Sequence, residues 1–194
     1  MITYRIDNSI YINLTNKCSN ACDFCVRTTS DEYSEFDLWL KNEPTSEEVI
    51  EDLKKYLNNF NNYVFCGYGE PTERLDTLIK VAKFLKENNK SIRLNTNGQS
   101  DLINGENSHL KLINLIDCVS ISLNNYDKLS YDSICHSRFG LVAFDSLINY
   151  AKNCKNSGIN TVFSLVRYKG VDIDKTQKLA DKLGIKLRIR ELIE

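Results

Sequence analysis

Three cysteines spaced as C-x3-C-x2-C are the residues of this sequence whose types and spacing most directly indicate chemistry. Cys18, Cys22 and Cys25 follow an alternating apolar run at residues 10–14. Three thiolates on one short loop can bind one iron–sulfur cluster or one metal ion. A [4Fe–4S] cluster that is bound by cysteine alone uses four of them. The spacing therefore predicts a cluster with one iron left open for another molecule.

The alternative for these cysteines is a zinc site. Structural zinc sites usually pair two C-x2-C units and are closed by four protein ligands. The other cysteines and both histidines are scattered and not spaced as further ligands: Cys66, Cys118, Cys135, Cys154, His109 and His136. We therefore favour the cluster and expect the other cysteines to be core or surface residues. The role of Cys66 stays open, because it precedes a glycine-rich loop at 67–72.

The composition is that of a globular protein. Of the 194 residues, 42% are hydrophobic and 26% are charged, and the formal net charge is −1. This length predicts one domain, residues 1–194, and the balanced charge gives no indication of a nucleic-acid partner. Because no apolar run reaches membrane-spanning length and no signal peptide is recognisable, we expect a cytoplasmic protein without a membrane partner.

Short β-like runs alternate with amphipathic helical runs along the chain. The predicted strands cover residues 10–14, 62–66, 91–94, 119–123, 161–166 and 185–189. The first predicted helix begins at a capping box formed by Thr45 and Glu48. Further helices are predicted around 75–85, 109–116 and 139–154, and from Asp172 or Asp174 to Gly184. The segment Thr28–Pro44, which contains Trp39, is predicted to be irregular, and its role stays open.

This alternation predicts an α/β fold with parallel strands joined by right-handed crossovers. Eight such units form a complete barrel of about 250 residues, and this chain has room for six. We therefore predict an open, partial (βα)6 TIM-like barrel, with a doubly wound open sheet as the alternative. In both folds, ligands bind at the carboxyl ends of the strands. The cysteine loop and the segments 67–72, 95–98 and 122–124 follow predicted strands, so they should meet at one edge of the sheet.

The cysteine loop, with the aromatic Phe24 directly before its third cysteine, resembles the signature of the radical S-adenosylmethionine (SAM) superfamily. Gly69-Glu70-Pro71, after the second predicted strand, resembles another motif of that family. The resemblance implies that the three cysteines bind a [4Fe–4S] cluster whose open iron is chelated by SAM. It also implies reductive cleavage of SAM to methionine and a 5′-deoxyadenosyl radical, which abstracts a hydrogen atom from a substrate. A reductant such as flavodoxin or ferredoxin would supply the electron.

The resemblance further implies which residues bind SAM near the first two strands. Tyr68, Gly69 and Glu70 match the segment that receives the SAM amino group. In that family a glycine is common at the position of Tyr68, directly before the glycine that matches Gly69. Gly69 allows the backbone to approach a ligand closely. Phe24 matches the aromatic residue that packs near the adenine.

The other implied SAM contacts follow the third and fourth predicted strands. Asn95 and Asn97 lie in a segment that resembles glycyl-radical activating enzymes, and Asn95 stands where an aspartate meets the ribose. An amide can still hydrogen-bond to a hydroxyl, but without the charge. Ser122 and Asn124 match polar residues that close on SAM.

Residues 16–27 and 66–72 together resemble the short radical SAM proteins associated with TatD-family nucleases, a resemblance that supplies no substrate. With six units, the open side of the barrel would be poorly covered, so we expect a bulky substrate or a partner protein to complete the site. Two other functions stay open. One is a glycyl-radical-enzyme activase, and the other is a non-catalytic iron–sulfur electron carrier or sensor, in which Glu70, Asn95 and Asn124 would be incidental.

Overall fold

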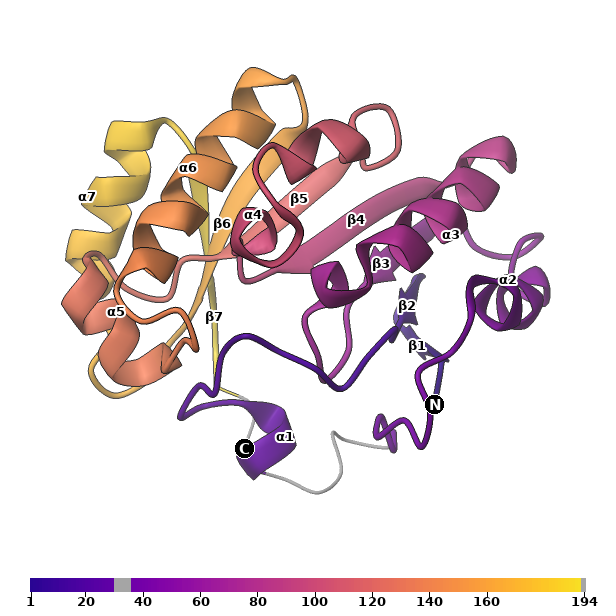
Figure 1. Cartoon of the computed structure of the whole chain (residues 1–194), viewed down its shortest axis with the longest axis horizontal. Helices are drawn as coiled ribbons and strands as arrows, with labels where there is room; N and C mark the ends of the chain where they lie inside the picture. Colours follow the sequence, from indigo (N-terminus) through magenta and orange to yellow (C-terminus); the bar gives the residue numbers. More distant parts are fainter. Residues whose placement is uncertain (30–35, 193–194) are drawn as a thin grey trace.

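The structure is a computed structural model that describes residues 1–29 and 36–192 of the chain. Its strands form one seven-stranded sheet in which each strand pairs with the next one in the sequence (Figure 1). The strands are β1 (Thr3–Ile6), β2 (Ser9–Ile12), β3 (Asn62–Phe65), β4 (Ser91–Thr96), β5 (Cys118–Ser122), β6 (Asn160–Val166) and β7 (Lys186–Arg190).

The pairing of the strands confirms the predicted open, partial barrel. β1 and β2 pair antiparallel, and all later neighbours pair parallel. A doubly wound sheet would reverse its strand order part-way across, so that alternative is wrong. The sequence patterns do not predict β1, a strand of four residues that joins β2 through a tight turn at Asp7, whose φ is 50°.

The helices agree with the predicted ones only in part. They are α1 (Val26–Thr29), α2 (Ser46–Lys54), α3 (Leu75–Glu87), α4 (Ser100–Asn104), α5 (Lys128–Cys135), α6 (Val142–Asn156) and α7 (Ile173–Leu183), with the 3-10 helices η1 (Pro71–Arg74) and η2 (Ser108–Leu112). The α-helix predicted at 109–116 is wrong, because only the 3-10 helix η2 forms there. The helical spacing that suggested it comes from Leu112 and Ile116, which are both buried. α6 begins at Val142 rather than 139, after Gly140 with its φ of 60°.

Two predicted helix caps are present. Thr45 Oγ1 accepts a hydrogen bond from the Glu48 N–H, and the Glu48 carboxylate accepts one from the Thr45 N–H. This reciprocal capping box fixes the start of α2. At α7 the cap is Asp172 rather than Asp174, and its carboxylate accepts from the Lys175 N–H at 3.0 Å.

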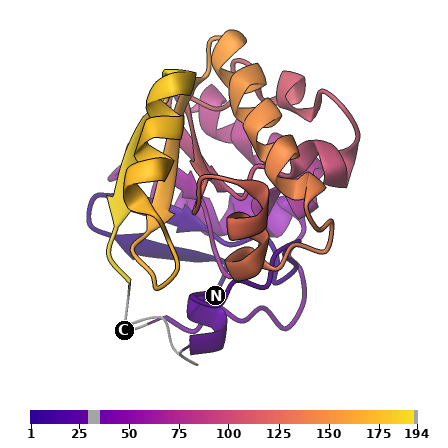
Figure 2. The ribbon, with the colours of Figure 1, turned by 90° about the vertical axis from the view of Figure 1, so that its left-hand side faces the viewer.

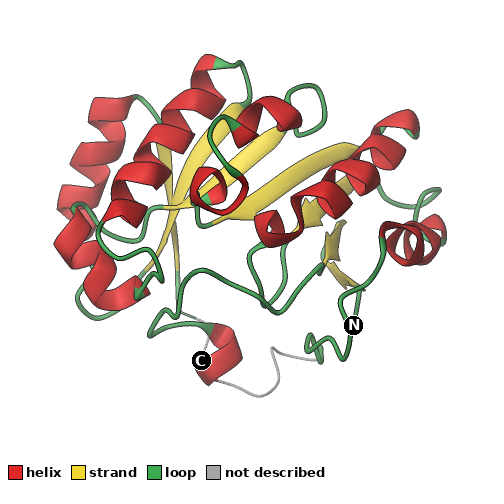
Figure 3. Cartoon of the chain, in the orientation of Figure 1, coloured by secondary structure: helices red, strands yellow, loops and turns green. Residues whose placement is uncertain are grey.

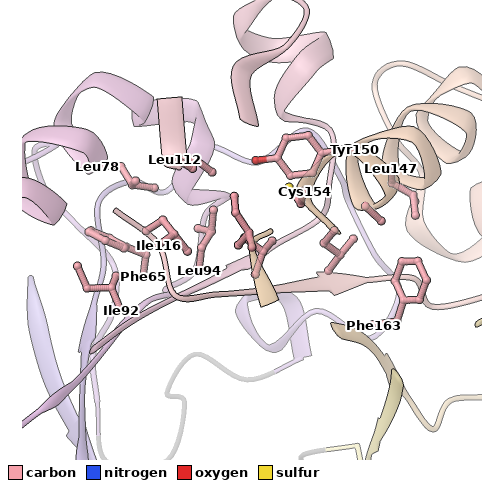
Figure 4. Packing of buried hydrophobic residues seen from close by; sticks show 14 of the residues in the cluster. Phe65, Leu78, Ile92, Leu94, Leu112, Ile116, Leu147, Tyr150, Cys154 and Phe163 are labelled. Atoms are coloured by element: carbon pink, nitrogen blue, oxygen red, sulfur yellow. The ribbon is translucent and has the colours of Figure 1, made fainter. Parts of the chain in front are cut away.

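The helices α3, α4, α6 and α7 cover one face of the sheet, which we call the outer face, whereas α1 lies at the bottom of both views (Figures 1 and 2). Alternate residues of the strands bury apolar side chains against those helices. Phe65, Leu94 and Phe163 belong to this core, which Figure 4 shows from close by. The strand residues in between point to the opposite, inner face. This two-sided pattern is expected for strands whose side chains alternate.

Of the segment Thr28–Pro44, residues 30–35 lie outside the described residues, and the described remainder after 35 contains no helix. Within residues 1–29 and 36–192, none of the helices combines the length and apolar character needed to cross a bilayer.

Candidate functional site

The cysteine loop runs from β2 to α1 and rests on the C-terminal end of α5 (Figure 3). The Ala21 N–H donates to the Cys135 carbonyl oxygen at 3.0 Å, and the Asp23 N–H donates to that of Ile134 at 3.0 Å. The Arg138 N–H donates to the Ser19 carbonyl oxygen at 2.8 Å. These backbone bonds hold the loop that carries the three cysteines against one helix end.

A buried polar network lies under the same loop. Asn20 Nδ2 donates to Tyr131 Oη at 2.9 Å, and Gln99 Nε2 donates to Asn20 Oδ1 at 2.7 Å and to Tyr131 Oη at 3.0 Å. Ser137 Oγ donates to Gln99 Oε1 at 2.9 Å. Gln99 and Tyr131 are fully buried. The network therefore ties the cysteine loop to α5 and to the start of α4 without leaving these amides unpaired.

The Tyr131 hydroxyl should be worth a measurable part of the stability. Tyr131→Phe leaves the buried amides of Asn20 and Gln99 without one acceptor, which costs about 1–3 kcal/mol of unfolding free energy. Chemical denaturation measures this loss. Tyr126→Phe is the matched control, because the Tyr126 hydroxyl contacts the exposed Lys175 Nζ, at 3.5 Å, rather than a buried amide. Equal stabilities of the two variants would contradict the role of the network.

The loop after β3 packs backbone against backbone with the cysteine loop. The Glu70 N–H donates to the Lys17 carbonyl oxygen at 2.8 Å. A Cβ atom at Gly69 would lie 2.3 Å from the Thr15 carbonyl oxygen and 2.5 Å from that of Lys17. No side chain fits there, so glycine at 69 is required for the two loops to touch.

Gly69→Ala should therefore destabilise the fold by about 1–3 kcal/mol or more, because a methyl group would force two backbones apart. Gly105→Ala is the control, since a Cβ at Gly105 meets nothing within 4 Å. Gly105 has φ 88° and ψ 162°, a region almost restricted to glycine, so the control has a backbone cost of about 1–3 kcal/mol but no steric clash. Thermal and denaturant unfolding measure stability, and iron content measures cluster uptake. A Gly69→Ala protein that takes up iron like the Gly105→Ala control would contradict the close approach.

Glu70 joins the loops after β3 and β4. Its carboxylate is 3% exposed and accepts four hydrogen bonds. Oε1 accepts from the Thr72 N–H at 3.0 Å, the Thr72 hydroxyl at 2.8 Å and the Thr96 hydroxyl at 2.7 Å, and Oε2 accepts from the Asn97 N–H at 2.7 Å. Burial raises the pKa of Glu70, and the four donors oppose that shift because they favour the carboxylate.

Asn97 extends this link to the cysteine loop. Its Nδ2 donates to Ser19 Oγ at 2.7 Å and lies 3.9 Å from Cys18 Sγ. The structure thus brings together Cys18, Glu70 and Asn97, which come from three predicted strand ends. Convergence of these segments at one edge was the expectation from the fold.

The surroundings of the three thiols favour the protonated forms until a cation binds them. Burial and the nearby Glu70 raise the pKa of Cys18 to about 12. The largest cause that raises the pKa of Cys22 is a hydrogen bond to Cys135, and burial is the second. Burial is also what raises the pKa of Cys25. Buried thiols of this kind lose their protons when a cation binds them. Among the described residues, no group of three His, Cys, Asp or Glu side chains is placed to bind a metal ion as it stands. The thiols would therefore have to turn toward a bound cluster.

Arg27 clamps the cysteine loop from its far end. Its Nη1 donates to the Asn16 carbonyl oxygen at 3.0 Å, and its Nη2 donates to that of Asn20 at 3.1 Å. The guanidinium also acts on Cys18 and Cys25 as a nearby positive charge that favours their thiolate forms. Because the sequence shows only a cationic residue two positions after Cys25, it does not reveal that both ends of the fork contact carbonyl groups.

Asn124 supplies an unpaired acceptor on the other side of the loop. It is buried with a left-handed φ of 53°, and its Nδ2 lies 3.6 Å from Cys135 Sγ. Its Oδ1 is buried and has no hydrogen-bond partner among the described residues. A buried acceptor in this state is rare and fits a donor from a bound molecule, such as the amino or hydroxyl groups of SAM. Cys135, expected to be a core cysteine, is buried and also touches Cys22.

The remaining predicted site residues take different positions. Asn95 and Ser122 lie on the inner face, where Asn95 pairs with Ser120 of β5 and Ser122 with Ser164 of β6. The Phe24 ring packs against Tyr168, with ring centroids 5.3 Å apart. Tyr68 is buried in a second apolar cluster with Tyr4 and Leu38, its ring 5.1 Å from that of Trp39. The Tyr68 side chain therefore packs, and its backbone belongs to the loop of Gly69 and Glu70.

Comparisons with known proteins identify the family of the chain and related folds. The sequence matches the family described as the Radical SAM superfamily over residues 12–183. No curated protein matches the sequence.

Solved structures show the same fold at low sequence identity. anSMEcpe with bound AdoMet, which is SAM, has a TM-score of 0.73 and 20% identity, covering 95% of this chain and 50% of its own. The FeFe-hydrogenase maturase HydG from Carboxydothermus hydrogenoformans has a TM-score of 0.63 and 17% identity, and the match covers 96% of this chain and 44% of HydG. A radical SAM methyltransferase from Sphaerobacter thermophilus has a TM-score of 0.60 and 13% identity, covering 97% and 68%. This chain spans about half the length of the first of these.

Proposed function

The chain belongs to the radical SAM superfamily, and from this premise we propose that it is an enzyme that cleaves SAM reductively to abstract a hydrogen atom from a substrate. In this proposal Cys18, Cys22 and Cys25 bind a [4Fe–4S] cluster. The superfamily's cofactor, when bound and reduced by a flavodoxin or ferredoxin, supplies a 5′-deoxyadenosyl radical from SAM. The site belongs to a single domain of residues 1–194.

The residues of the chain would hold and orient SAM at the strand ends. The backbone of Tyr68, Gly69 and Glu70 offers acceptors for the amino group, and the unpaired Oδ1 of Asn124 accepts from another donor of SAM. Asn95 and Ser122 present polar groups on the inner face beside them.

The remaining contacts would come from Asn97, which reaches the cysteine loop, and from Phe24, which gives an apolar wall near the adenine. Because Phe24 is mostly buried against Tyr168, it would also help to exclude water from that side.

One observation carries the proposal. Asn97 joins Glu70 to the cysteine loop. Its backbone N–H donates to Glu70 Oε2, and its side-chain amide donates to Ser19 Oγ. One candidate cluster ligand, Cys18, and two candidate SAM-binding residues, Glu70 and Asn97, are thus linked through one set of hydrogen bonds. An electron carrier has no need for a second ligand site beside its cluster.

The test is whether SAM reaches the cluster. The protein is reconstituted anaerobically, reduced with dithionite, and measured by EPR with and without SAM. We expect SAM to change the signal of the reduced cluster, since it would complete the open iron. An unchanged signal would favour the non-catalytic carrier or sensor. The glycyl-radical activase would instead require a partner that acquires a protein-based radical, which EPR detects when a candidate partner is added to the sample with SAM.

A further inference from the structure

The two faces of the sheet differ in chemistry. On the outer face, apolar strand residues pack against helices. Register places the intervening residues on the inner face, for example Val64, Arg93 and Cys118 in one row across β3, β4 and β5. Asn95, Ser120 and Val162 form the next row. The inner face thus presents polar and charged side chains, such as Arg93, Asn95 and Ser120, between apolar ones.

Charge on the inner face has one sign. Among the strand residues that the structure describes, it carries four cations and no Asp or Glu: Arg93, Lys186, Arg188 and Arg190 are the cations. The whole chain is nearly neutral, with 25 Lys and Arg against 26 Asp and Glu. The positive charge of this face is therefore a local feature and does not reflect a basic protein.

Three of the cations follow one another on β7. Lys186, Arg188 and Arg190 alternate with Leu187 and Ile189, so all three point to the inner face. They are exposed. Within residues 1–29 and 36–192, none of the three forms an ion pair or a side-chain hydrogen bond. Their charges are thus available to a ligand.

Arg93 gives an independent indication from the middle of the sheet. Its Nη2 donates to Tyr11 Oη at 3.2 Å, but its Nε is buried and has no hydrogen-bond partner in the described part of the chain. A buried donor of a charged group is costly to leave unpaired. An anion at the inner face would supply the missing acceptor.

Protection of a sheet edge is the simplest other explanation for the β7 charges, because edge strands often carry Lys to prevent pairing with another sheet. It does not account for Arg93, which lies on β4 with β3 and β5 on either side. It also does not account for the absence of strand acids from the same face.

We propose that the inner face binds the substrate through at least two anionic groups, phosphates or carboxylates, one held by Lys186, Arg188 and Arg190 on β7 and another by Arg93 on β4. This inference rests on the proposed function, because the substrate must lie beside SAM, and Asn95 and Ser122 share the same face. Guanidinium groups bind both kinds of anion with paired hydrogen bonds.

The experiment measures anion binding by the reconstituted protein with SAM present. Calorimetric titration uses tripolyphosphate and citrate as separate probes, which distinguishes phosphate from carboxylate recognition. The test variant combines Lys186→Gln, Arg188→Gln and Arg190→Gln. The control variant combines Lys152→Gln, Lys178→Gln and Lys182→Gln, which removes the same charge from exposed lysines on α6 and α7.

We expect at least one probe to bind the wild type. The affinity of the test variant for that probe should be at least about tenfold weaker, and the affinity of the control variant should stay within about twofold of wild type. Equal weakening in both variants, or no binding of either probe, would overturn the inference. Should the test variant fail to fold, Arg93→Gln alone is compared with the wild type, and it should also weaken binding of the probe. Cleavage of SAM by the wild type is measured in parallel, so that a failed proposed function is distinguished from a failed anion site.

Discussion

Replacing any one of Cys18, Cys22 or Cys25 by alanine should abolish stable binding of a [4Fe–4S] cluster. The three thiols lie on one loop that backbone bonds to α5 and the Arg27 fork hold in place. With two thiols left, the site has too few soft ligands for a cubane cluster. Iron and sulfide content after anaerobic reconstitution, together with the visible absorbance, measures the loss, which we expect to be nearly complete in each variant.

Cys118→Ala is the matched control for this series. Cys118 is half-buried on the inner face beside Arg93, in another strand, and its loss should leave the iron content unchanged. Cys135→Ala is informative as well, since Cys135 touches Cys22 without being a predicted ligand. A variant of Cys18, Cys22 or Cys25 that keeps a full, SAM-responsive cluster would show that the ligands are assigned wrongly.

Glu70→Ala should give the second large effect, on stability and on SAM binding together. Removal of the carboxylate leaves the N–H groups of Thr72 and Asn97 and the Thr96 hydroxyl without their acceptor. Each unsatisfied buried donor costs about 1–3 kcal/mol, so we expect a total loss of about 3–9 kcal/mol for the three donors. That is a large share of the about 5–15 kcal/mol that stabilises a typical domain. Denaturant unfolding measures it.

Glu70→Gln separates the two effects. It keeps the size of the side chain and the acceptor for Thr72 and Thr96, but turns an amide toward the Asn97 N–H. We expect a smaller loss, about 1–3 kcal/mol, with weaker SAM binding because Asn97 shifts. Glu51→Ala, an exposed site on α2, should stay within about 0.5 kcal/mol of wild type. A Glu70→Ala protein as stable as the Glu51→Ala protein would contradict the network.

The fold could be predicted largely because its strands are long enough to show their pattern. β4 and β5 carry apolar residues at alternate positions, β6 is a mostly apolar run, and helices such as α3 and α6 show helical spacing. The four-residue β1 and the five-residue α4 are too short to show a period. The sequence wrongly predicts an α-helix at η2, because the helical spacing of Leu112 and Ile116 allows both to be buried without a complete α-helix.

The candidate site could be predicted where a motif names its own residues. The cysteine loop and the Gly69–Glu70 segment have recognisable spacings. The contacts of Gln99, Tyr131 and Cys135 depend on segments far apart in the sequence, so no local pattern indicates them. The unpaired Oδ1 of Asn124 is likewise a property of packing. Tertiary contacts of this kind become visible only when the strand ends are brought together.

The measurement that tests the central claim most directly is product formation from SAM. The reconstituted protein is reduced with dithionite under anaerobic conditions and incubated with SAM, and 5′-deoxyadenosine and methionine are quantified by chromatography. We expect both products in equal amounts, and neither from the Cys18→Ala, Cys22→Ala or Cys25→Ala proteins. A protein with a full, reducible cluster that releases no 5′-deoxyadenosine would contradict the proposed function.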